Sequence, residues 1–505
     1  MARDQRMEAM VQLNPNRVDK EESVEHIDRP WRRTAAALVV LGLLVGACQG
    51  TTSTASPAAG TPAATTPAAS EPAASQAAGE PVEIEWYVGL GTGENEEQIP
   101  VEEAVVAAFN ESQDTIELKL TVVDNTEAAD TLATRIAAGD SPDIIGPIGI
   151  RGLQSFGDQL LDIGPLIASS GLDLSEIDQS LIDAYKVDGK QIGIPMAVYS
   201  SFIYYNKALF EEAGLPEPPH EVGAQYDGKE WNWATVRDLA MKLTVDTNGN
   251  DATSADFDAT KIDVYGLDAQ FTENDARAWS TIFGGSGSAV GDDGTTAQWP
   301  DNWRAGLQFM YDGIWKDHFI PDQTAVQGLA DGNTFQSGRI AMDVVHQWYT
   351  CFVYPGEGEA QVKDWDVAVL PAGPDGTITS KLHADTIGIM DSTENPEAAF
   401  EALSFLIKSP ELIQTWGAMP AIESQRAAFF AGLDERFAPL DIDWNVSSLM
   451  LQYPDNPSHE AFMPNFQEAD SANKDLGSKL WTTPDLDLDA EIDKHVERLQ
   501  GIFGG

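Results

Sequence analysis

The chain has 505 residues, of which 30 are basic and 81 acidic, so its formal net charge is −51 at pH 7. Such a charge repels nucleic acids and anionic lipid headgroups, which excludes both as binding partners. We attribute the acidity to solubility in an external medium rather than to an acid-dependent function. Cys48 and Cys351 are the only cysteines, so we expect no disulfide framework, and neither a CxxC pair nor a His-rich motif predicts a metal site.

The first 47 residues predict an export signal. Arginines at positions 29, 32 and 33 form a basic patch, and residues 34–46 follow as an apolar stretch too short to span a bilayer. The stretch ends in Leu-Val-Gly-Ala-Cys at residues 44–48, which resembles the bacterial lipobox, whose cysteine thiol receives a diacylglyceryl group. We therefore expect lipidation at Cys48, which anchors the chain to the outer face of the cytoplasmic membrane and is its only membrane contact.

Residues 49–80 consist almost entirely of Ala, Pro, Ser, Thr and Gly. Because they lack aromatic side chains and aliphatic side chains larger than alanine, they cannot bury enough apolar surface to offset the entropy of ordering. We expect residues 48–80 to be a disordered tether that proline keeps extended. The globular body over residues 81–505 is long enough for two domains.

The body begins with alternating strands and helices. Apolar residues alternate over residues 82–88, and a glycine-rich turn at residues 89–93 precedes an amphipathic helix. Residues 116–122 form the next predicted strand, a second helix follows, and a third strand begins at residue 143. This order predicts an α/β fold with a mostly parallel sheet and helices on both faces, which binds ligands beyond the carboxyl ends of the strands.

The glycine-rich turn does not match a dinucleotide site. The Rossmann fingerprint requires a third glycine at position 94, where this chain has Glu94. A carboxylate at this helix N-terminus repels pyrophosphate. We interpret the turn as a loop that lets the backbone approach a neutral ligand.

Five later segments form a recognisable series. They are DGKQIGIP at residues 188–195, YYNKALFEEAGL at 204–215, the helix at 233–243, FQSGRIAM at 335–342 and WDVAVLP at 365–371. In sequence and in order they resemble family 1 extracellular solute-binding proteins, the sugar-binding subunits of ABC importers. The fourth segment has arginine where the family has lysine. The similarity runs from about residue 82 to the C-terminus.

The resemblance implies a two-lobed periplasmic-binding-protein-like fold of class II. Each lobe would be a mixed, mostly parallel sheet with flanking helices, and the ligand would lie in a cleft at the hinge. Lobe 1 would comprise residues 81–195 and 371–415, and lobe 2 residues 196–370 and 416–505, with crossings near 195–199, 370–372 and 416–419. The resemblance also implies a monomer that is not an enzyme and delivers a sugar or oligosaccharide to ABC permease subunits.

Sugars expose apolar C–H faces and hydroxyl groups, so their sites combine aromatic platforms with side chains that donate and accept hydrogen bonds. From the loops that the family uses, we expect Trp348 to be the stacking platform, with His346 and Gln347 as polar partners. Trp416 and Trp481 lie on predicted helices, so we assign them to the core. The other expected ligand contacts are Tyr199 after the first crossing, Trp279 before the small-residue run at 284–287, and Trp86, Glu94, Asn95, Asp143 and Asp385 from the first lobe.

A loop that begins at Asp246 resembles a calcium loop. Asp246, Asn248 and Asn250 place oxygen-bearing side chains at alternate positions, as in related binding proteins, but the twelfth position is Phe257 instead of a bidentate glutamate. A solvated turn rich in Asn and Gly explains the same residues. We expect no other cofactor.

Two alternative functions remain open at this point. A secreted glycoside hydrolase would also use carboxylates, but no motif fixes a pair of them across a sugar ring, and hydrolase elbow, zinc-protease and P-loop motifs are absent from the sequence. A binding protein of the same fold can instead serve a sensor. The particular solute cannot be predicted from the sequence.

Overall fold

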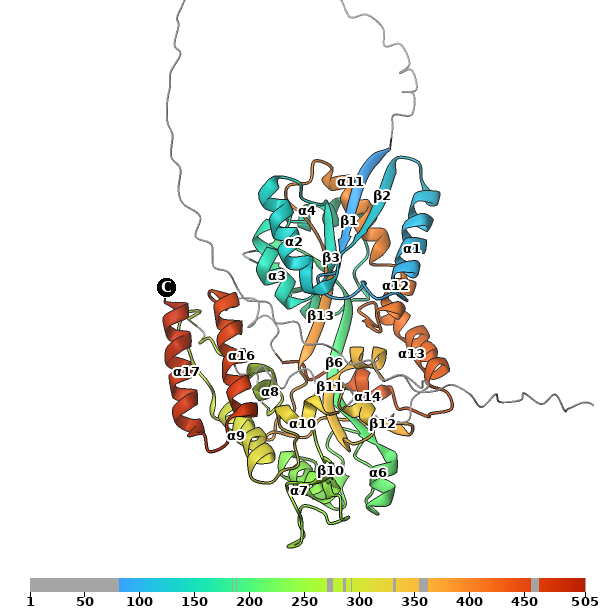
Figure 1. Cartoon of the computed structure of the whole chain (residues 1–505). Coiled ribbons are helices and arrows are strands. Elements are labelled where there is room, and N and C mark those ends of the chain that lie inside the picture. Colours follow the sequence, from blue (N-terminus) through green and yellow to red (C-terminus); the bar gives the residue numbers. More distant parts are fainter. Residues whose placement is uncertain are drawn as a thin grey trace, which may run out of the picture. The chain divides into compact units, whose positions relative to one another are not determined.

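The computed structural model describes residues 81–183, 185–187, 189–269, 276–284, 288–291, 293–329, 333–353, 362–455 and 463–504 (Figure 1). These residues belong to one compact unit, Ser75–Gly505. The predicted signal segment, Cys48 and the tether lie outside the described residues. In the described part of the chain, no helix combines the length and the apolar character needed to cross a membrane.

The first strands form a parallel sheet. β1 (Val82–Val88) pairs with β2 (Ile116–Val122) along its whole length and with β3 (Ile144–Ile148) on its other edge. Helices α1 (Ile99–Ser112) and α2 (Asn125–Ala138) follow β1 and β2, which confirms the predicted order of elements. Gly89 directs the chain out of β1, because its φ is 128° and a Cβ there would lie 2.0 Å from the carbonyl oxygen of Val123.

One long strand organises the rest of the sheet. All 13 residues of β6 (Ile194–Asn206) are buried. Its first half pairs with β13 (Leu382–Ile389) and β14 (Met419–Pro420), and its second half pairs with β11 (Met342–His346) and β12 (Trp365–Ala368). The eight strands therefore form one sheet in the order β11-β6-β13-β3-β1-β2, with β12 and β14 also paired to β6. Figure 1 shows β6 and β13 running from the region of β1 to β3 into the region of β11 and β12.

The structure has the predicted mixed α/β architecture, but the parallel pairs are concentrated in one part of it. Every strand paired with β6 is antiparallel to it, and β13 is also antiparallel to β3. Between residues 265 and 343, parallel pairing is present as isolated bridges of Tyr265 to Ile340 and of Asp268 to Asp343. The strands around β6 run antiparallel to it instead of being linked to it by helical crossovers, so antiparallel pairing dominates in this part of the sheet.

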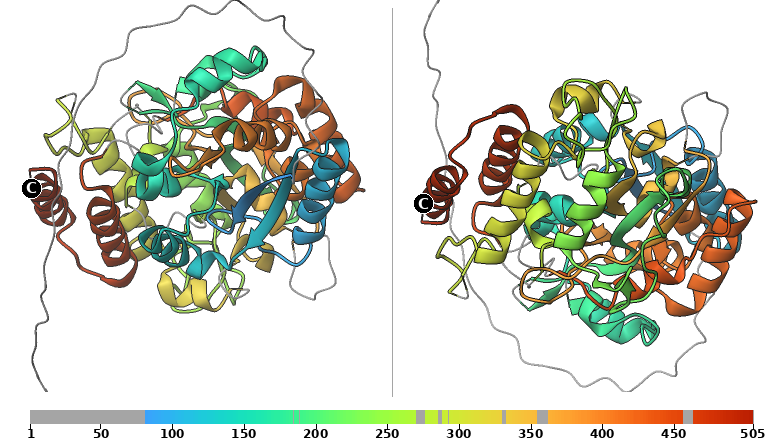
Figure 2. Two further views of the ribbon diagram at one scale, coloured as in Figure 1. Left: turned by 90° about the horizontal axis from the view of Figure 1, so that it is seen from above. Right: turned by 90° about the horizontal axis from the view of Figure 1, so that it is seen from below.

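Helices cover this sheet and add a separate layer near the C-terminus (Figure 2). Helix α7 matches the predicted range, and it buries Val236, Leu239 and Leu243 after an N-cap in which Asn232 accepts a hydrogen bond from the Thr235 N–H at 3.0 Å. The longer helices are α7 (Trp233–Leu243), α9 (Asp301–Trp315), α11 (Pro396–Leu406), α13 (Glu423–Phe437), α16 (Phe466–Thr482) and α17 (Leu488–Phe503). The shorter ones include α3 (Ile150–Phe156), α6 (Lys207–Glu212), α8 (Ala276–Thr281), α12 (Pro410–Thr415) and α14 (Asn445–Met450).

Candidate functional site

Three segments from distant parts of the sequence meet at the middle of β6. His346 at the end of β11 pairs with Ser201, His383 of β13 pairs with Tyr199, and Met419 of β14 pairs with Val198. We call this region, residues 198–201 with their paired residues and the adjoining 3-10 helix η4 (Gln347–Cys351), the strand junction. The predicted residues Tyr199, His346, Gln347, Trp348 and Asp385 all lie in it or next to it.

Two buried side chains of the strand junction have no hydrogen-bond partner within the described part of the chain. Neither ring nitrogen of His346 and neither polar atom of the Gln347 amide has a hydrogen-bond partner among the residues that the structure describes. His346 is 1% exposed and Gln347 is fully buried. An unsatisfied buried polar group costs about 1–3 kcal/mol, so a water molecule or a ligand that supplies these hydrogen bonds would stabilise this arrangement.

Aromatic rings surround His346. Its ring lies nearly parallel to that of His383, with centroids 4.0 Å apart, and to that of Trp348, with centroids 5.7 Å apart. Trp348 is partly exposed, and its edge contact with Phe352 extends the aromatic surface outward. Burial, helped by the nearby Lys381 charge, lowers the pKa of His346 well below its ordinary value. The imidazole is therefore neutral near pH 7, so it can donate one hydrogen bond and accept another.

Asp385 adds a carboxyl group to the same region. The Tyr199 hydroxyl donates to Asp385 Oδ2 at 3.1 Å. Burial raises the pKa of Asp385 to about 6, although the hydrogen bond from Tyr199 opposes the rise. The buried Tyr185 hydroxyl has no hydrogen-bond partner within the described residues, and burial followed by the Asp385 charge raises its pKa well above the ordinary value.

The loop after β1 presents a second set of carboxyl groups. Gln98 Oε1 accepts a hydrogen bond from the Gly93 N–H at 2.9 Å and so fixes the end of the glycine-rich turn. Glu94 is partly buried, burial raises its pKa, and its Oε2 has no partner in the described part of the chain, whereas Asn95 is exposed. Behind them, Glu102 is fully buried and accepts a hydrogen bond from Trp416 Nε1 at 2.9 Å.

Three of the expected ligand contacts are occupied by contacts within the protein. Trp86 is fully buried and its Nε1 donates to the Gly146 carbonyl oxygen at 2.8 Å. Trp279 is 1% exposed, donates to the Gly306 carbonyl oxygen at 2.8 Å and packs against Phe283 and Phe309. Asp143 accepts hydrogen bonds from the Glu85 N–H and the Thr393 hydroxyl. These contacts within the protein occupy the tryptophan rings and both carboxylate oxygens of Asp143. The three residues therefore stabilise the packing of the core and do not offer these groups to a ligand at the strand junction.

The remaining tryptophan assignments agree with the structure. Trp416 and Trp481 are 2% and 1% exposed, as expected for core residues. The last three residues of the small-residue run after Trp279, residues 285–287, lie outside the described residues.

Sequence reasoning did not select Tyr185, Glu102 or His383. His383 was detectable, because it precedes Asp385 by two residues on β13 and therefore points to the same face of the strand. Tyr185 and Glu102 gave no local signal, since only the tertiary structure places them beside Asp385 and Trp416.

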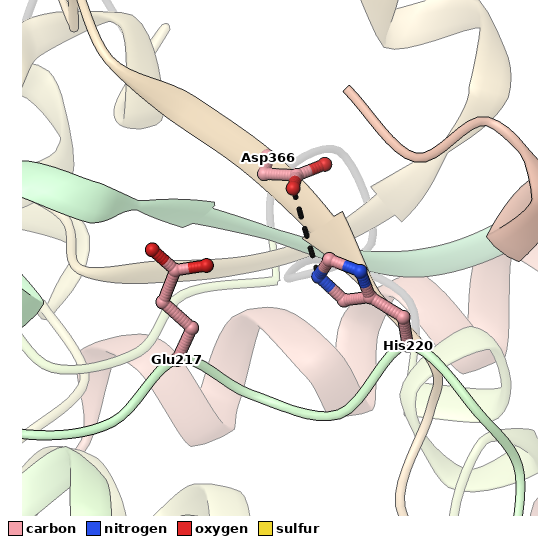
Figure 3. Close-up of side chains that lie close together, drawn as sticks. All are labelled: Glu217, His220 and Asp366. Carbon is pink, nitrogen blue, oxygen red and sulfur yellow. Dashed lines mark ion pairs between the residues drawn. The ribbon is translucent and has the colours of Figure 1, made fainter. Parts of the chain in front are cut away.

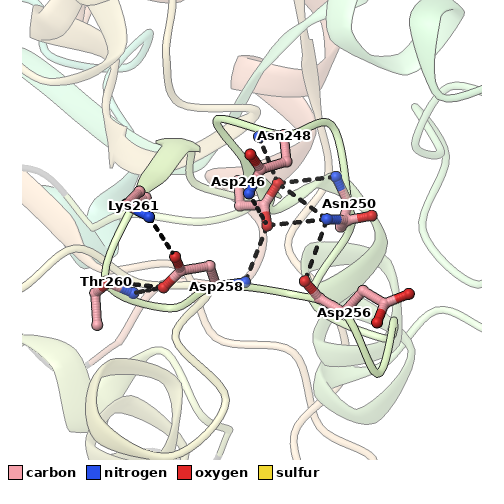
Figure 4. Close-up of polar contacts among 7 residues, drawn as sticks. All are labelled: Asp246, Asn248, Asn250, Asp256, Asp258, Thr260 and Lys261. Carbon is pink, nitrogen blue, oxygen red and sulfur yellow. Dashed lines mark hydrogen bonds and ion pairs between the residues drawn. The ribbon is translucent and has the colours of Figure 1, made fainter.

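The loop at Asp246 is closed by hydrogen-bond donors (Figure 4). Asp246 Oδ1 accepts from the backbone N–H groups of Asn248 at 2.8 Å and Asn250 at 3.0 Å, and Oδ2 accepts from the Asp258 N–H at 2.9 Å. A calcium ion requires several oxygen ligands that face one point, whereas N–H donors face this carboxylate. The geometry favours the solvated-turn interpretation, and calcium binding stays a prediction.

The mixed α/β architecture is that of a two-lobed periplasmic-binding-protein-like fold. Residues 94–411 match the family model described as bacterial extracellular solute-binding protein, and the chain belongs to this family. A Brucella abortus (strain 2308) protein named as a binding protein is 26% identical over 366 residues, which cover 68% of this chain and 81% of that protein.

Solved structures support the same fold. The ABC substrate-binding protein of Listeria monocytogenes in complex with cycloalternan is 19% identical, with a TM-score of 0.66, over 84% of this chain and 99% of that chain. The sugar-binding protein MalE of Xanthomonas citri is 18% identical, with a TM-score of 0.63, over 84% and 98% of the two chains. A cyclic alpha-maltosyl-1,6-maltose binding protein of Arthrobacter globiformis is 17% identical, with a TM-score of 0.62, over 84% and 100%.

Proposed function

We propose that the chain binds a sugar or oligosaccharide at the strand junction and delivers it to the permease of an ABC importer. The observation that carries this proposal is the set of four buried polar atoms on His346 and Gln347, beside the partly exposed ring of Trp348, for which the described residues supply no hydrogen-bond partner. A sugar supplies what this set requires, because its hydroxyls both donate and accept hydrogen bonds and its C–H face stacks on an aromatic ring. The sugars and oligosaccharides named for structures of similar fold support the same ligand class.

The protonation state of the site favours a neutral ligand. His346 is neutral because burial lowers its pKa, and the Gln347 amide carries no charge at any pH. Asp385, with a pKa of about 6, already accepts a hydrogen bond from Tyr199. The groups without partners at the strand junction are thus uncharged, which suits hydroxyl groups better than a phosphate or an ammonium group.

The proposed location is the outer face of the cytoplasmic membrane. A lipid on Cys48 and an extended tether would keep the receptor near the permease and raise its effective concentration there. The family's extracellular character supports export of the chain. A receptor that feeds a sensor would need the same anchor, and loss of sugar uptake in cells without this protein would distinguish transport from sensing.

A thermal-shift and native mass-spectrometry screen against monosaccharides and oligosaccharides tests the ligand class. A ligand that binds only the folded state stabilises it by about 2.7 kcal/mol at a concentration of 100 times Kd. We expect stabilisation by one class of sugar, with the sugar recovered unchanged. A shortened product in the same sample would overturn the proposal in favour of a glycoside hydrolase, and no stabilisation by any sugar would overturn the ligand class.

A further inference from the structure

A second cluster of polar side chains lies at the far end of β6, outside the strand junction (Figure 3). Tyr205 of β6 pairs with Asp366 of β12. Glu217 and His220 approach this pair from the loop that follows α6, and Asp443 approaches from the segment that precedes α14. Four separate segments of the second lobe therefore converge on one point.

The ligand-type atoms of the cluster are close together. One donor atom from each of Glu217, His220 and Asp366 lies within 4.8 Å of the other two. His220 Nε2 lies 3.6 Å from Asp366 Oδ2. The Tyr205 hydroxyl lies 2.9 Å from Glu217 Oε2 and 3.1 Å from His220 Nε2.

Further hydrogen bonds and polar contacts orient the side chains of Asp366 and His220. Asp366 Oδ1 accepts hydrogen bonds from the backbone N–H groups of Val367 at 2.8 Å and Asp443 at 2.9 Å. The other oxygen, Oδ2, is thereby left directed toward the cluster. His220 Nδ1 lies 3.3 Å from Asp443 Oδ2, so this carboxylate holds the proton on Nδ1 and leaves Nε2 as an acceptor. A carboxylate behind a histidine is the usual outer-shell arrangement of a metal-bound imidazole.

Carboxylates outnumber lysine and arginine side chains in the cluster. Among the described residues, Glu217, Asp366 and Asp443 supply carboxylates, whereas Lys207, with Nζ 3.7 Å from Glu217 Oε1, supplies an ammonium group. The Tyr205 hydroxyl has a single proton but faces three acceptors, Glu217 Oε2, Asp366 Oδ2 and His220 Nε2. Asp366 is 3% exposed, so water cannot screen its charge.

We propose that Glu217, His220 and Asp366 bind a divalent transition-metal ion, with Zn²⁺ as the best match. One imidazole nitrogen and two carboxylate oxygens suit Zn²⁺, and water or the Tyr205 hydroxyl completes a tetrahedral shell. Mg²⁺ and Ca²⁺ prefer oxygen ligands only, so the imidazole selects against them. Glu217 is exposed and His220 is partly exposed, which gives the ion a route from solvent. The ion would join β12 to the loop that follows α6.

Titration of the chelator-treated protein with Zn²⁺ by isothermal calorimetry, in buffer without sugar, tests this site. We expect one Zn²⁺ to bind with a Kd below roughly 10 μM, a higher melting temperature with the metal, and no effect of Mg²⁺ on binding. His220→Gln should weaken binding at least tenfold. The matched control is Glu221→Gln, which changes an exposed glutamate of the same loop that is outside the cluster.

A Co²⁺ titration monitored by absorption spectroscopy reports on the coordination itself. We expect a tetrahedral cobalt spectrum in the wild type and in Glu221→Gln, and its loss in Glu217→Gln and His220→Gln, with circular dichroism used to verify folding. Tyr205→Phe should still bind Co²⁺ with a tetrahedral spectrum, because water can take the place of the hydroxyl in the shell. Absence of Zn²⁺ binding in the wild type, or equal binding in His220→Gln, would show that the cluster only holds the Tyr205 hydroxyl and would overturn the proposal.

Discussion

His346 and Gln347 are exceptions to the rule that buried polar groups form hydrogen bonds. Most such groups in folded proteins have hydrogen-bond partners, because each unsatisfied one costs about 1–3 kcal/mol. Here two adjacent residues at the end of β11 have none among the described residues, while the neighbouring Tyr199 and Asp385 satisfy one another. We expect a ligand that supplies these hydrogen bonds to restore the stability lost at these positions.

A substitution of Trp348 should affect sugar binding without affecting folding. We expect Trp348→Ala to weaken sugar binding by about 10- to 100-fold, because loss of a stacked aromatic ring removes about 1–3 kcal/mol. Its ring is partly exposed, so the melting temperature of the free protein should change little. Isothermal calorimetry with the sugar found in the screen measures the affinity.

The matched control for Trp348 is Trp315→Ala. Trp315 of α9 is also partly exposed, and it donates to the Leu480 carbonyl oxygen at 2.8 Å, away from the strand junction. This variant should lower the melting temperature without changing the affinity. Unchanged affinity in Trp348→Ala would remove Trp348 as the platform.

Glu102 makes the stability of the protein depend on pH. Burial raises its pKa to about 7, although the Trp416 N–H opposes the rise. A carboxyl group whose pKa is higher in the folded state contributes stability below its unfolded pKa, near 4.3, and this contribution is lost as the pH rises through about 7. Glu102→Gln keeps an acceptor for Trp416 Nε1 and cannot ionise.

We therefore expect Glu102→Gln to be more stable than the wild type at pH 8, by up to about 3 kcal/mol, and to differ little from it at pH 4. Thermal melts at the two pH values measure the difference. Glu103→Gln, at an exposed position on the same helix, should show no such dependence. An equal difference at both pH values would contradict the role assigned to the Glu102 charge.

At the scale of elements, the loop that follows α7 is organised by one carboxylate. Burial alone would raise the pKa of Asp246, but hydrogen bonds from the backbone of Asn250, Asp258 and Asn248 outweigh it and lower the pKa below its ordinary value. Stability from such a group is present above the unfolded pKa, near 3.9, and is lost as the pH falls through the lower folded pKa.

Asp246→Asn should therefore lower the melting temperature by several degrees at pH 7, because a neutral amide oxygen accepts these hydrogen bonds more weakly. The loss should shrink in strong acid, and Asp256→Asn, at an exposed position of the same loop, is the control. Adding calcium to chelator-treated wild type tests the alternative use of the loop, since a bound ion would raise the melting temperature and Asp246→Asn would abolish that rise.

Elements with local periodicity were predictable and long-range pairings were not. The alternation of β1 and β2 and the amphipathic face of α7 are visible in the sequence. The structure confirms both strands and the helix, although Trp86, Tyr87 and Val88 at the end of β1 are all buried. The contact of His346 with His383 joins residues 37 apart in the numbering, and Glu217 meets Asp366 only through the pairing of β6 with β12. No periodic pattern specifies such contacts. Tryptophans illustrate the limit, because the residue type alone does not distinguish Trp86 and Trp279, which are buried, from Trp348, which is partly exposed.

For the whole molecule, the anchor can be tested apart from the receptor. We expect Cys48→Ser to move the protein from the membrane fraction to the medium or periplasm, because serine cannot receive the thioether-linked lipid. Sugar binding by the released protein should equal that of the wild type, since the binding residues all lie beyond residue 80. Immunoblots of fractionated cells measure the distribution, and a Cys351→Ser variant should remain membrane-bound.

The continuity of β6 affects how the body unfolds. The same 13-residue strand contributes hydrogen bonds to β13 and β14 in one half and to β11 and β12 in the other. If either half of β6 unfolds, the strands paired with the other half lose part of the sheet that supports them. Calorimetry should therefore show a single cooperative transition instead of two. The amides of β6 should also be among the last to exchange with deuterium, because they open only when the whole body unfolds.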